Sequence, residues 1–183
     1  MVAGPLSTRL RFGLIALVAA LALVGAACSG SDSESSDTPA AADAALGDPA
    51  PDFSVMTLDG SGFTLSEHLE DDGRPLFLNM WASWCPPCKA EMPDINAASE
   101  SNEDVKFIGV AVNDDSAAST DFAISTGITY TIGFDTDGTV ADDYQVRGLP
   151  ATYIISADGI ILERIFGPVT EADIDEKLAN WFS

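Results

Sequence analysis

The sequence predicts an α/β domain, a mixed β-sheet flanked by helices, from three observations. Between residue 48 and the C-terminus, apolar runs of strand length alternate with segments in which apolar residues recur at helical spacing. The residues Ser156-Ala157-Asp158-Gly159 separate two apolar segments and indicate a hairpin. The last segment begins with Thr170 and Asp173, which fit a helix capping box. We therefore expect parallel strand pairs at the centre of the sheet and antiparallel strands at one edge.

The folded region is expected to open with a short hairpin. Residues 53–58 read as a strand, residues 59–60 as a turn and residues 63–65 as a strand that pairs back. We expect Ser66 to cap a short helix that runs through Leu69.

The run from Pro75 to Trp81 has strand length and is almost entirely apolar, which predicts a buried central strand. The remaining elements follow from the same signals. In chain order we expect a helix, a strand, a helix, a strand, a short helix, two strands and a final helix at residues 86–100, 105–112, 116–126, 130–134, 139–144, 152–155, 160–166 and 170–181.

The first 27 residues have the pattern of an export signal. Arg9 and Arg11 precede an apolar run over residues 12–24, and Gly25-Ala26-Ala27 supplies small residues for processing. The run is short for a membrane-spanning helix, which needs about 20 residues. Extending the run through the alanines leaves an uncleaved anchor as an alternative.

Cys28 directly follows these small residues and resembles the processing site of bacterial lipoproteins, where the cysteine is acylated and becomes the new N-terminus. Such sites usually carry Leu where this chain has Gly25, and an ordinary signal peptide cut near Ala27 is the alternative. Residues 29–47 have no aromatic and no basic residue. We expect a signal peptide over residues 1–27, an acylation site and disordered tether over 28–47, and one folded domain over 48–183.

The chain is strongly acidic, with 29 acidic and 8 basic residues and a formal net charge of −21. A surface of this sign repels phosphate backbones, so we expect no binding to nucleic acid. The acidic residues are scattered along the chain, which indicates a role in solubility.

The strongest chemical signal is the motif Trp84-Cys85-Pro86-Pro87-Cys88. Its two cysteines are three residues apart where a strand passes into a helix. The first turn of a helix offers unpaired N–H groups and a partial positive charge, which favour the reactive thiolate. Pro86 suits the first helical position because its missing N–H would be unpaired there anyway. We therefore predict a redox-active dithiol.

Two other roles for the cysteine pair are a zinc half-site and a static disulfide. Zinc needs two more ligands, and the chain offers only His68 and Cys28, which do not form a second ligand pair. A static disulfide has no need of the surrounding prolines and tryptophans. We expect no metal and no cofactor, and we expect His68 on the surface without a role.

The sequence around the motif resembles a known family. Residues 77–93 read Phe-Leu-Asn-Met-Trp-Ala-Ser-Trp-Cys-Pro-Pro-Cys-Lys-Ala-Glu-Met-Pro, residues 49–53 read Pro-Ala-Pro-Asp-Phe, and residues 146–152 read Val-Arg-Gly-Leu-Pro-Ala-Thr. These segments resemble the TlpA/ResA-type branch of the thioredoxin superfamily, exported and membrane-tethered thiol–disulfide oxidoreductases of bacteria. The resemblance spans residues 48–183. It implies a thioredoxin-like fold with an N-terminal hairpin extension and a mid-domain insertion over residues 113–135.

The resemblance also implies roles for single residues. Cys85 would be the exposed nucleophile and Cys88 the buried resolving thiol. Pro150 would be the cis-proline of the superfamily, which faces the disulfide and aligns the backbone of the substrate, although an X-Pro bond taken alone is cis only about 5% of the time. We expect Trp84, Pro86, Leu149 and Pro150 to contact the substrate.

Glu91 lies three residues after Cys88, on the same face of the expected helix. A carboxylate there can take the proton of Cys88 during resolution, whereas a solvated surface glutamate is the alternative. Thioredoxins place a buried Asp on the preceding strand, where this chain has Asn79, which cannot exchange a proton. Glu91 matches the glutamate of the branch's Cys-Pro-Pro-Cys-x-x-Glu-x-Pro pattern, so we expect it to handle the proton.

The two prolines between the cysteines favour a reductant. Neither Pro86 nor Pro87 can donate an N–H to the Cys85 thiolate, and a less stabilised thiolate makes a more reducing couple. We expect the protein to reduce cysteine-containing protein partners outside the cytoplasmic membrane, with electrons from a membrane thiol–disulfide donor. In this branch such reductants often serve cytochrome c maturation.

Several alternatives remain, among them a ligand-binding lipoprotein whose disulfide has no redox role. A disulfide-forming oxidase would use the same cysteines. A peroxiredoxin also opens with Pro-Ala-Pro-Asp-Phe, but it carries a Pro and a Thr before its cysteine, where this chain has Trp-Ala-Ser-Trp. A copper-handling lipoprotein normally has three residues between its cysteines and a partnering histidine.

Overall fold

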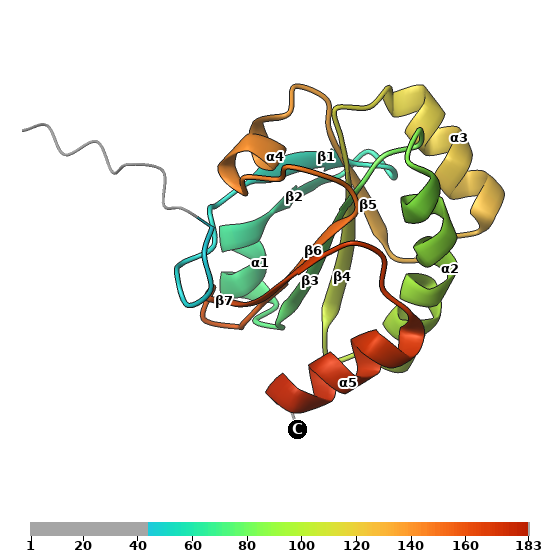
Figure 1. The fold of residues 1–183 in the computed structure, drawn as a ribbon. Helices are drawn as coiled ribbons and strands as arrows, with labels where there is room; N and C mark the ends of the chain where they lie inside the picture. Colours follow the sequence, from blue (N-terminus) through green and yellow to red (C-terminus); the bar gives the residue numbers. More distant parts are fainter. Residues whose placement is uncertain (1–43, 183) are drawn as a thin grey trace, which may run out of the picture. The chain divides into compact units, whose positions relative to one another are not determined.

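The computed structural model describes residues 44–182, which form a seven-stranded mixed β-sheet with helices on both faces (Figure 1). The strand order is β2-β1-β5-β4-β3-β6-β7. The elements are β1 (Ser54–Thr57), β2 (Gly62–Thr64), α1 (Leu65–Asp71), β3 (Leu76–Trp81), α2 (Pro86–Ser101), β4 (Lys106–Val112), α3 (Ser116–Thr126), β5 (Thr131–Asp135), α4 (Thr139–Asp143), β6 (Ala151–Ile155), β7 (Ile161–Phe166) and α5 (Glu171–Phe182).

The parallel pairs lie at the centre of the sheet, as expected, but antiparallel strands occupy both edges and not one. β3 and β4 are parallel and are joined by α2, while β4 and β5 are parallel and are joined by α3. The hairpin β6–β7 forms one antiparallel edge. The N-terminal hairpin forms the other, because Met56 of β1 pairs with Phe134 of β5 and so covers an edge that would otherwise be unpaired.

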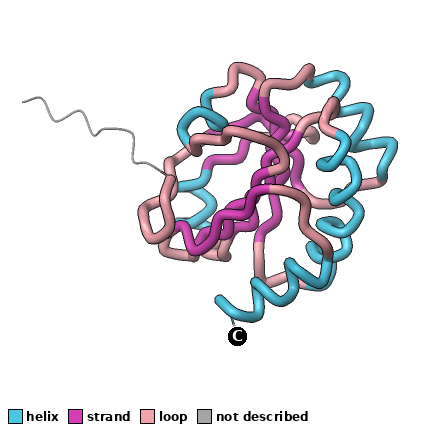
Figure 2. Tube along the Cα trace, in the orientation of Figure 1, coloured by secondary structure: helices cyan, strands magenta, loops and turns pink. Residues whose placement is uncertain are grey.

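The segment 113–135, expected as an insertion, supplies α3 and β5 and extends the sheet between β4 and the N-terminal hairpin. α3 ends at Gly127, whose φ of 69° closes the helix in a left-handed conformation. The strands fill the middle of the domain and the helices lie outside them (Figure 2).

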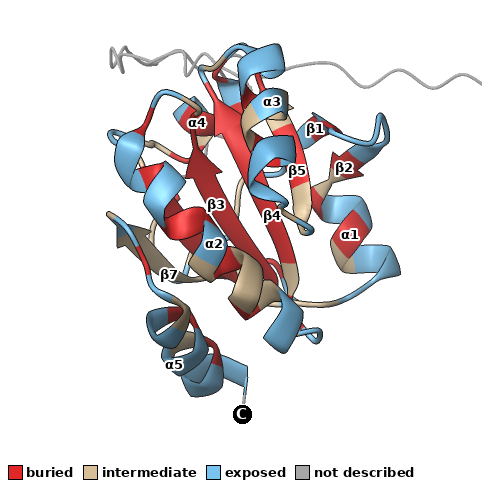
Figure 3. Cartoon of the chain, turned by 90° about the vertical axis from the view of Figure 1, so that its right-hand side faces the viewer, coloured by how far each residue is buried: buried red, intermediate tan, exposed pale blue. Residues whose placement is uncertain are grey.

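The central strand β3 is buried along its whole length (Figure 3). Its side chains alternate between two cores, as the period of a strand requires. Leu78 and Met80 belong to the core on the side of α1 and α4. Phe77 and Trp81 lie on the opposite side, Phe77 in a cluster with residues of α2 and α5, and Trp81 in a cluster with residues of α2 and α3. Trp81 is fully buried, as predicted.

Gly109 of β4 provides the space for two large rings beside β3. A Cβ atom at this position would lie 3.0 Å from the ring of Tyr130 and 3.1 Å from Nε1 of Trp81. The absence of a side chain at Gly109 therefore allows Trp81 and Tyr130 to pack side by side on the face that carries α2.

Two expectations for α1 are wrong. The helix begins at Leu65 with Thr64 as its N-cap and without a side-chain capping bond. Ser66 instead donates from its N–H and its hydroxyl to the carboxylate of Asp52. His68 is buried rather than exposed, because the ring of Phe63 in the first hairpin packs against it. Its Nε2 lies 2.9 Å from the carbonyl oxygen of Arg74.

The C-terminal elements follow the prediction closely. The β6–β7 hairpin closes through a hydrogen bond from Ser156 N to Ile160 O. The capping box of α5 is confirmed, because Thr170 N donates to the Asp173 carboxylate and Asp173 N donates to the Thr170 hydroxyl. This cap fixes the position of Val169, the residue just before it.

Packing begins slightly before the expected start of the domain. Ala44 is buried in the core, and Gly47 N donates to Ile161 O at the start of β7. The signal peptide over residues 1–27, the acylation site at Cys28 and most of the tether lie outside the described residues. Within residues 44–182, no helix is long and apolar enough to cross a membrane.

Candidate active site

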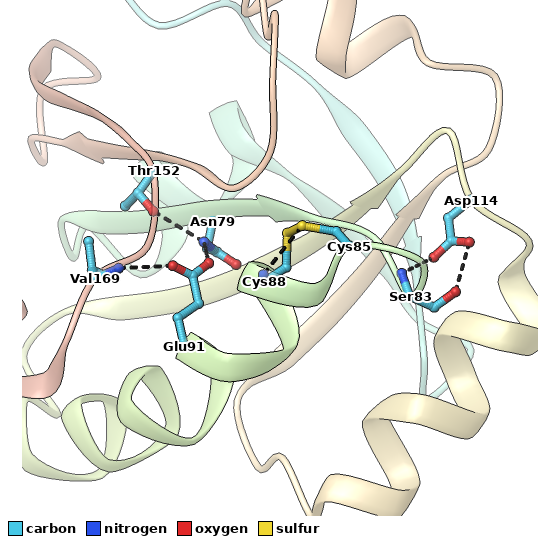
Figure 4. The surroundings of a disulfide bond; sticks show 8 residues. All are labelled: Asn79, Ser83, Cys85, Cys88, Glu91, Asp114, Thr152 and Val169. Atoms are coloured by element: carbon cyan, nitrogen blue, oxygen red, sulfur yellow. Dashed lines mark hydrogen bonds between the residues drawn. A yellow bond between two sulfur atoms is a disulfide. The ribbon is translucent and has the colours of Figure 1, made fainter.

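The two cysteines of the motif form a disulfide at the start of α2 (Figure 4). Cys85 is the N-cap residue, and Pro86 and Pro87 occupy the first two helical positions. The Cα atoms of the two cysteines are 5.3 Å apart. Cys88 N donates to Sγ of Cys85 at a distance of 3.3 Å. The first turn of the helix therefore directs an N–H group at the first sulfur, as the sequence predicted.

The expected exposure of the nucleophile is wrong for this oxidised form. Cys85 is only 3% exposed and Cys88 is fully buried. Both sulfurs pack in a core cluster with Trp81 and Met92, and Leu149 covers this cluster from outside. Cys85 is nevertheless the one cysteine of the pair with any access to solvent, so it remains the one that a partner can reach.

The loop before β6 lies against the disulfide. The Leu149–Pro150 peptide bond is cis, as the resemblance implied. Pro150 is buried, and its carbonyl oxygen accepts a hydrogen bond from Gly167 N at 3.0 Å. Of the four expected substrate contacts, Trp84 and Pro86 are exposed, Leu149 is half-buried and Pro150 is buried.

Glu91 is buried behind the disulfide, one turn after Cys88 on α2, which excludes a solvated surface position. Its Oε1 accepts a hydrogen bond from Asn79 Nδ2 at 2.9 Å, and its Oε2 accepts one from Val169 N at 3.0 Å. Burial raises the pKa of Glu91 to about 7, against the opposing effect of these two hydrogen bonds. A carboxyl group with this pKa is suited to exchanging protons at neutral pH.

Asn79 holds Glu91 from the central strand. It is fully buried, and its Nδ2 also donates to the hydroxyl of Thr152 at 3.1 Å. Sequence reasoning missed Thr152 and Val169 as partners in this group. The capping box at Thr170 was the one signal for Val169, because it marks the residue whose N–H lies just before a helix start.

Comparison with known proteins now decides the family. The AhpC/TSA family model matches residues 46–164. The chain belongs to the AhpC/TSA family.

Two bacterial proteins with named activities are similar to this chain over most of its length. The thiol-disulfide oxidoreductase ResA of Geobacillus kaustophilus is 33% identical over 138 residues, which cover 74% of this chain and 78% of ResA. The thiol:disulfide interchange protein DsbE of Escherichia coli is 32% identical over 136 residues, which cover 74% of this chain and 72% of DsbE.

A solved structure agrees with the fold. A thioredoxin-family thiol:disulfide interchange protein of Chlorobium tepidum superposes with a TM-score of 0.65 at 30% identity, covering 74% of this chain and 97% of that one. The fold is thus thioredoxin-like, and this AhpC/TSA-family protein is a thiol–disulfide oxidoreductase of the ResA and DsbE type.

Around the Asn79–Glu91 pair, three of the buried polar atoms have no hydrogen-bond partner among residues 44–182. They are Oδ1 of Asn79 itself, Nε1 of Trp81 and the hydroxyl of Tyr130. Burial and the charge of Glu91 both raise the pKa of Tyr130. The interior behind the disulfide therefore contains a group of buried polar atoms. The part of the chain that the structure describes offers no group of three or more His, Cys, Asp or Glu side chains that could hold a metal ion.

Proposed function

We propose that this protein reduces disulfides in partner proteins outside the cytoplasmic membrane, with Cys85 as the nucleophile and Cys88 as the resolving thiol. The observation that carries this proposal is the arrangement of Figure 4, a disulfide at the start of α2 with the buried carboxyl group of Glu91 one turn behind it.

The reaction has two exchange steps. The Cys85 thiolate attacks a partner disulfide, which forms a mixed disulfide and releases one partner thiolate. Glu91 then takes the proton of Cys88, and the Cys88 thiolate attacks Sγ of Cys85. This second step forms the Cys85–Cys88 disulfide and releases the second partner thiolate, so two electrons pass to the partner. Glu91 acts as the general base in the second step.

Partner proteins approach on the side of Cys85, the cysteine of the pair that retains slight access to solvent. Trp84 and Pro86 present apolar surface beside Cys85, while Leu149, from the loop before β6, packs against the cluster that holds the sulfurs. We assign substrate contact to Trp84, Pro86 and Leu149 because they lie around Cys85, and to Pro150 because the resemblance to the TlpA/ResA branch implies that role.

The hydrogen-bond donors around Cys85 support the proposed direction of electron flow. Pro86 and Pro87 have no N–H, so among the described residues Cys88 N is the single donor to Sγ of Cys85. Few donors leave the thiolate poorly stabilised, which favours the disulfide and makes the reduced protein a stronger reductant.

The N-terminal sequence supports a location at the outer face of the cytoplasmic membrane. The signal-like residues 1–27 and the cysteine that follows them fit a lipid anchor at Cys28, and the acidic, Ser-rich segment after it fits a tether. A membrane thiol–disulfide protein would supply the electrons. By its resemblance to the TlpA/ResA branch, the protein would prepare cysteines that receive haem in cytochrome c maturation.

A redox titration of residues 44–183 against glutathione tests the direction. A reductant is expected to have a potential below about −200 mV. A potential near about −120 mV, typical of strong oxidants, would show that the protein forms disulfides and would overturn the proposed direction.

The anchor has its own test. Expression of the full chain in a bacterium fed with labelled palmitate should label the wild type and place it in the membrane fraction. The Cys28→Ala variant should be unlabelled. Equal labelling of both proteins, or none of either, would contradict acylation at Cys28.

A further inference from the structure

A second carboxylate outside the cysteine motif holds the chain segment that leads into Cys85. Asp114 lies between β4 and α3, and its carboxylate accepts hydrogen bonds from the N–H of Ser83 and from the Ser83 hydroxyl, the latter at 3.0 Å (Figure 4). It also accepts bonds from the Ser119 hydroxyl at 2.6 Å and from Asp115 N at 2.9 Å. One side chain thus joins the active-site loop to the start of α3.

The next residue of the loop is held by the same turn. Trp84 Nε1 donates to the carbonyl oxygen of Asn113 at 3.3 Å, although the Trp84 side chain is 61% exposed. Asn113 adopts a φ of 49°, in the left-handed region that few residues other than Gly enter readily. This turn lets the Asn113 carbonyl and the Asp114 carboxylate face residues 83 and 84 together.

The Asp114 carboxylate carries a negative charge at neutral pH. Burial acts to raise the pKa of Asp114, but hydrogen bonds from Ser119 and Ser83 outweigh burial and hold it below its usual value. Ser83 is two residues from Cys85, so their Cα atoms are separated by at most about 7 Å. The negative charge of Asp114 is bonded to the segment that leads into Cys85 and opposes formation of a thiolate there, because like charges repel in a partly buried site.

We propose that Asp114 is a positioning residue for Cys85, which fixes the segment Ser83–Trp84 beside the nucleophile and lowers the reduction potential of the Cys85–Cys88 couple. Asp114 touches neither the sulfurs nor the substrate, and it acts through the loop and through its charge. The inference rests on disulfide exchange at Cys85 and deepens the proposed reductase function.

A purely structural role for Asp114 would be to start α3. The structure gives that role to its neighbour, because Asp115 is the N-cap of α3 and its side chain accepts a hydrogen bond from Ala118 N. Asp115 is exposed, and this bond directs its carboxylate into the first turn of α3. The two adjacent carboxylates therefore form a matched pair for experiment.

The test compares Asp114→Asn, Asp114→Ala and the control Asp115→Asn in the full chain, with Cys28→Ala in every protein so that Cys85 and Cys88 are the remaining cysteines. Each reduced protein is equilibrated with glutathione disulfide. In this reaction the protein dithiol is oxidised to the Cys85–Cys88 disulfide, and one glutathione disulfide is reduced to two molecules of glutathione. At about pH 9.5, where an ordinary cysteine thiol is largely ionised, we expect the equilibrium constant for protein oxidation to fall about threefold in Asp114→Asn, since this change removes the charge that opposes the thiolate and keeps an acceptor for Ser83. The rate of Cys85 alkylation by iodoacetamide at pH 7 should rise in the same variant.

The Ala variant separates the anchor from the charge. Asp114→Ala should show the same shift in equilibrium and, in addition, a slower reduction of a protein disulfide than Asp114→Asn, since Ser83 and Trp84 lose their anchor. Asp115→Asn should leave both the equilibrium constant and the thermal stability nearly unchanged, because Asn caps a helix about as well as Asp.

An unchanged equilibrium constant in Asp114→Asn, or an equal shift in Asp115→Asn, would overturn the inference. The absolute potential of the wild type tests the direction of electron flow separately. A wild-type potential in the oxidising range with a clear Asp114 shift would therefore sink the reductase proposal and leave the role of Asp114 standing.

Discussion

Asn79 and Glu91 are joined by a hydrogen bond of 2.9 Å between two buried side chains, one on the central strand and one on the active-site helix. The bond, together with that from Val169 N, holds the carboxyl group behind Cys88. An amide at position 79 accordingly does not leave the site without a proton carrier. It positions the carboxyl group that we propose as the proton carrier.

The first prediction concerns how stability depends on pH. Glu91 has a pKa of about 7 in the folded protein and 4.5 as its ordinary value. The folded state thus binds this proton more tightly, and the stability contributed by protonated Glu91 is complete below about pH 4.5 and is lost as the pH rises through about 7. Between pH 4.5 and 8, we expect the wild type to lose up to about 3 kcal/mol that Glu91→Gln does not lose.

Urea unfolding of the oxidised proteins across this pH range measures the difference. Glu176→Gln, a change at an exposed position on α5, serves as the control and should follow the wild type. Parallel stability curves for the wild type and Glu91→Gln would show that Glu91 ionises in the folded protein as readily as in the unfolded chain.

The second prediction concerns the resolving step. Glu91→Gln removes the base that takes the proton of Cys88. In a protein whose Cys85 carries a mixed disulfide with glutathione, attack by Cys88 and release of glutathione should therefore slow by about 10²-fold or more at pH 8. Formation of the mixed disulfide at Cys85 should be nearly unchanged. In the wild type the resolving rate should fall as the pH drops below about 7, where Glu91 becomes protonated.

Stopped-flow measurement of glutathione release follows this step directly. Glu100→Gln is the control, because Glu100 is an exposed glutamate on the same helix. If both variants resolve at the wild-type rate, another group removes the proton from Cys88.

The third prediction places two carboxyl groups at the same site. Asn79→Asp replaces the donor to Glu91 by a second buried carboxyl group, and two such groups in contact cannot both ionise at low cost. We expect this variant to lose more stability than Asn79→Ala between pH 6 and pH 9. Unfolding midpoints at the two pH values measure the effect. A pH dependence equal in the two variants would mean that the introduced carboxyl group finds a partner other than Glu91.

The fourth prediction concerns the packing beneath the site. Gly109→Ala brings a Cβ atom to within 3.1 Å of Ile132 and Trp81, so we expect a loss of about 1–3 kcal/mol in the free energy of unfolding. Gly62→Ala is the matched control, since a Cβ on that strand meets nothing within 4 Å. Equal stabilities of the two variants would show that the rings beside Gly109 move aside without cost.

The element boundaries could be read from the sequence because local signals mark them. Gly127 ends α3, and Asp158-Gly159 closes the last hairpin, as their conformational preferences require. The order of the strands could not be read in the same way. Nothing local in Met56 indicates that it pairs with Phe134, so the N-terminal hairpin was predicted but its place at the second edge of the sheet was not.

The same contrast between local and distant signals applies to the active site. The cysteines and Glu91 lie within one short motif, and their spacing along a helix predicts their proximity. Val169 and Asp114 reach the site from distant parts of the chain, 78 residues from Glu91 and 31 residues from Ser83. The burial of Cys85 also depends on such distant packing, with Leu149 covering the cluster, which explains why the sequence indicated an exposed sulfur.

The division of roles between the two cysteines can be tested most directly by trapping with glutathione disulfide. Reduced Cys88→Ala and Cys85→Ala variants are mixed with glutathione disulfide at pH 7 and analysed by mass spectrometry over time. Cys88→Ala is expected to form a stable glutathione adduct on Cys85 rapidly, while the fully buried Cys88 of the other variant reacts much more slowly. Equal rates in the two variants, or faster reaction at Cys88, would contradict the assignment of Cys85 as the nucleophile.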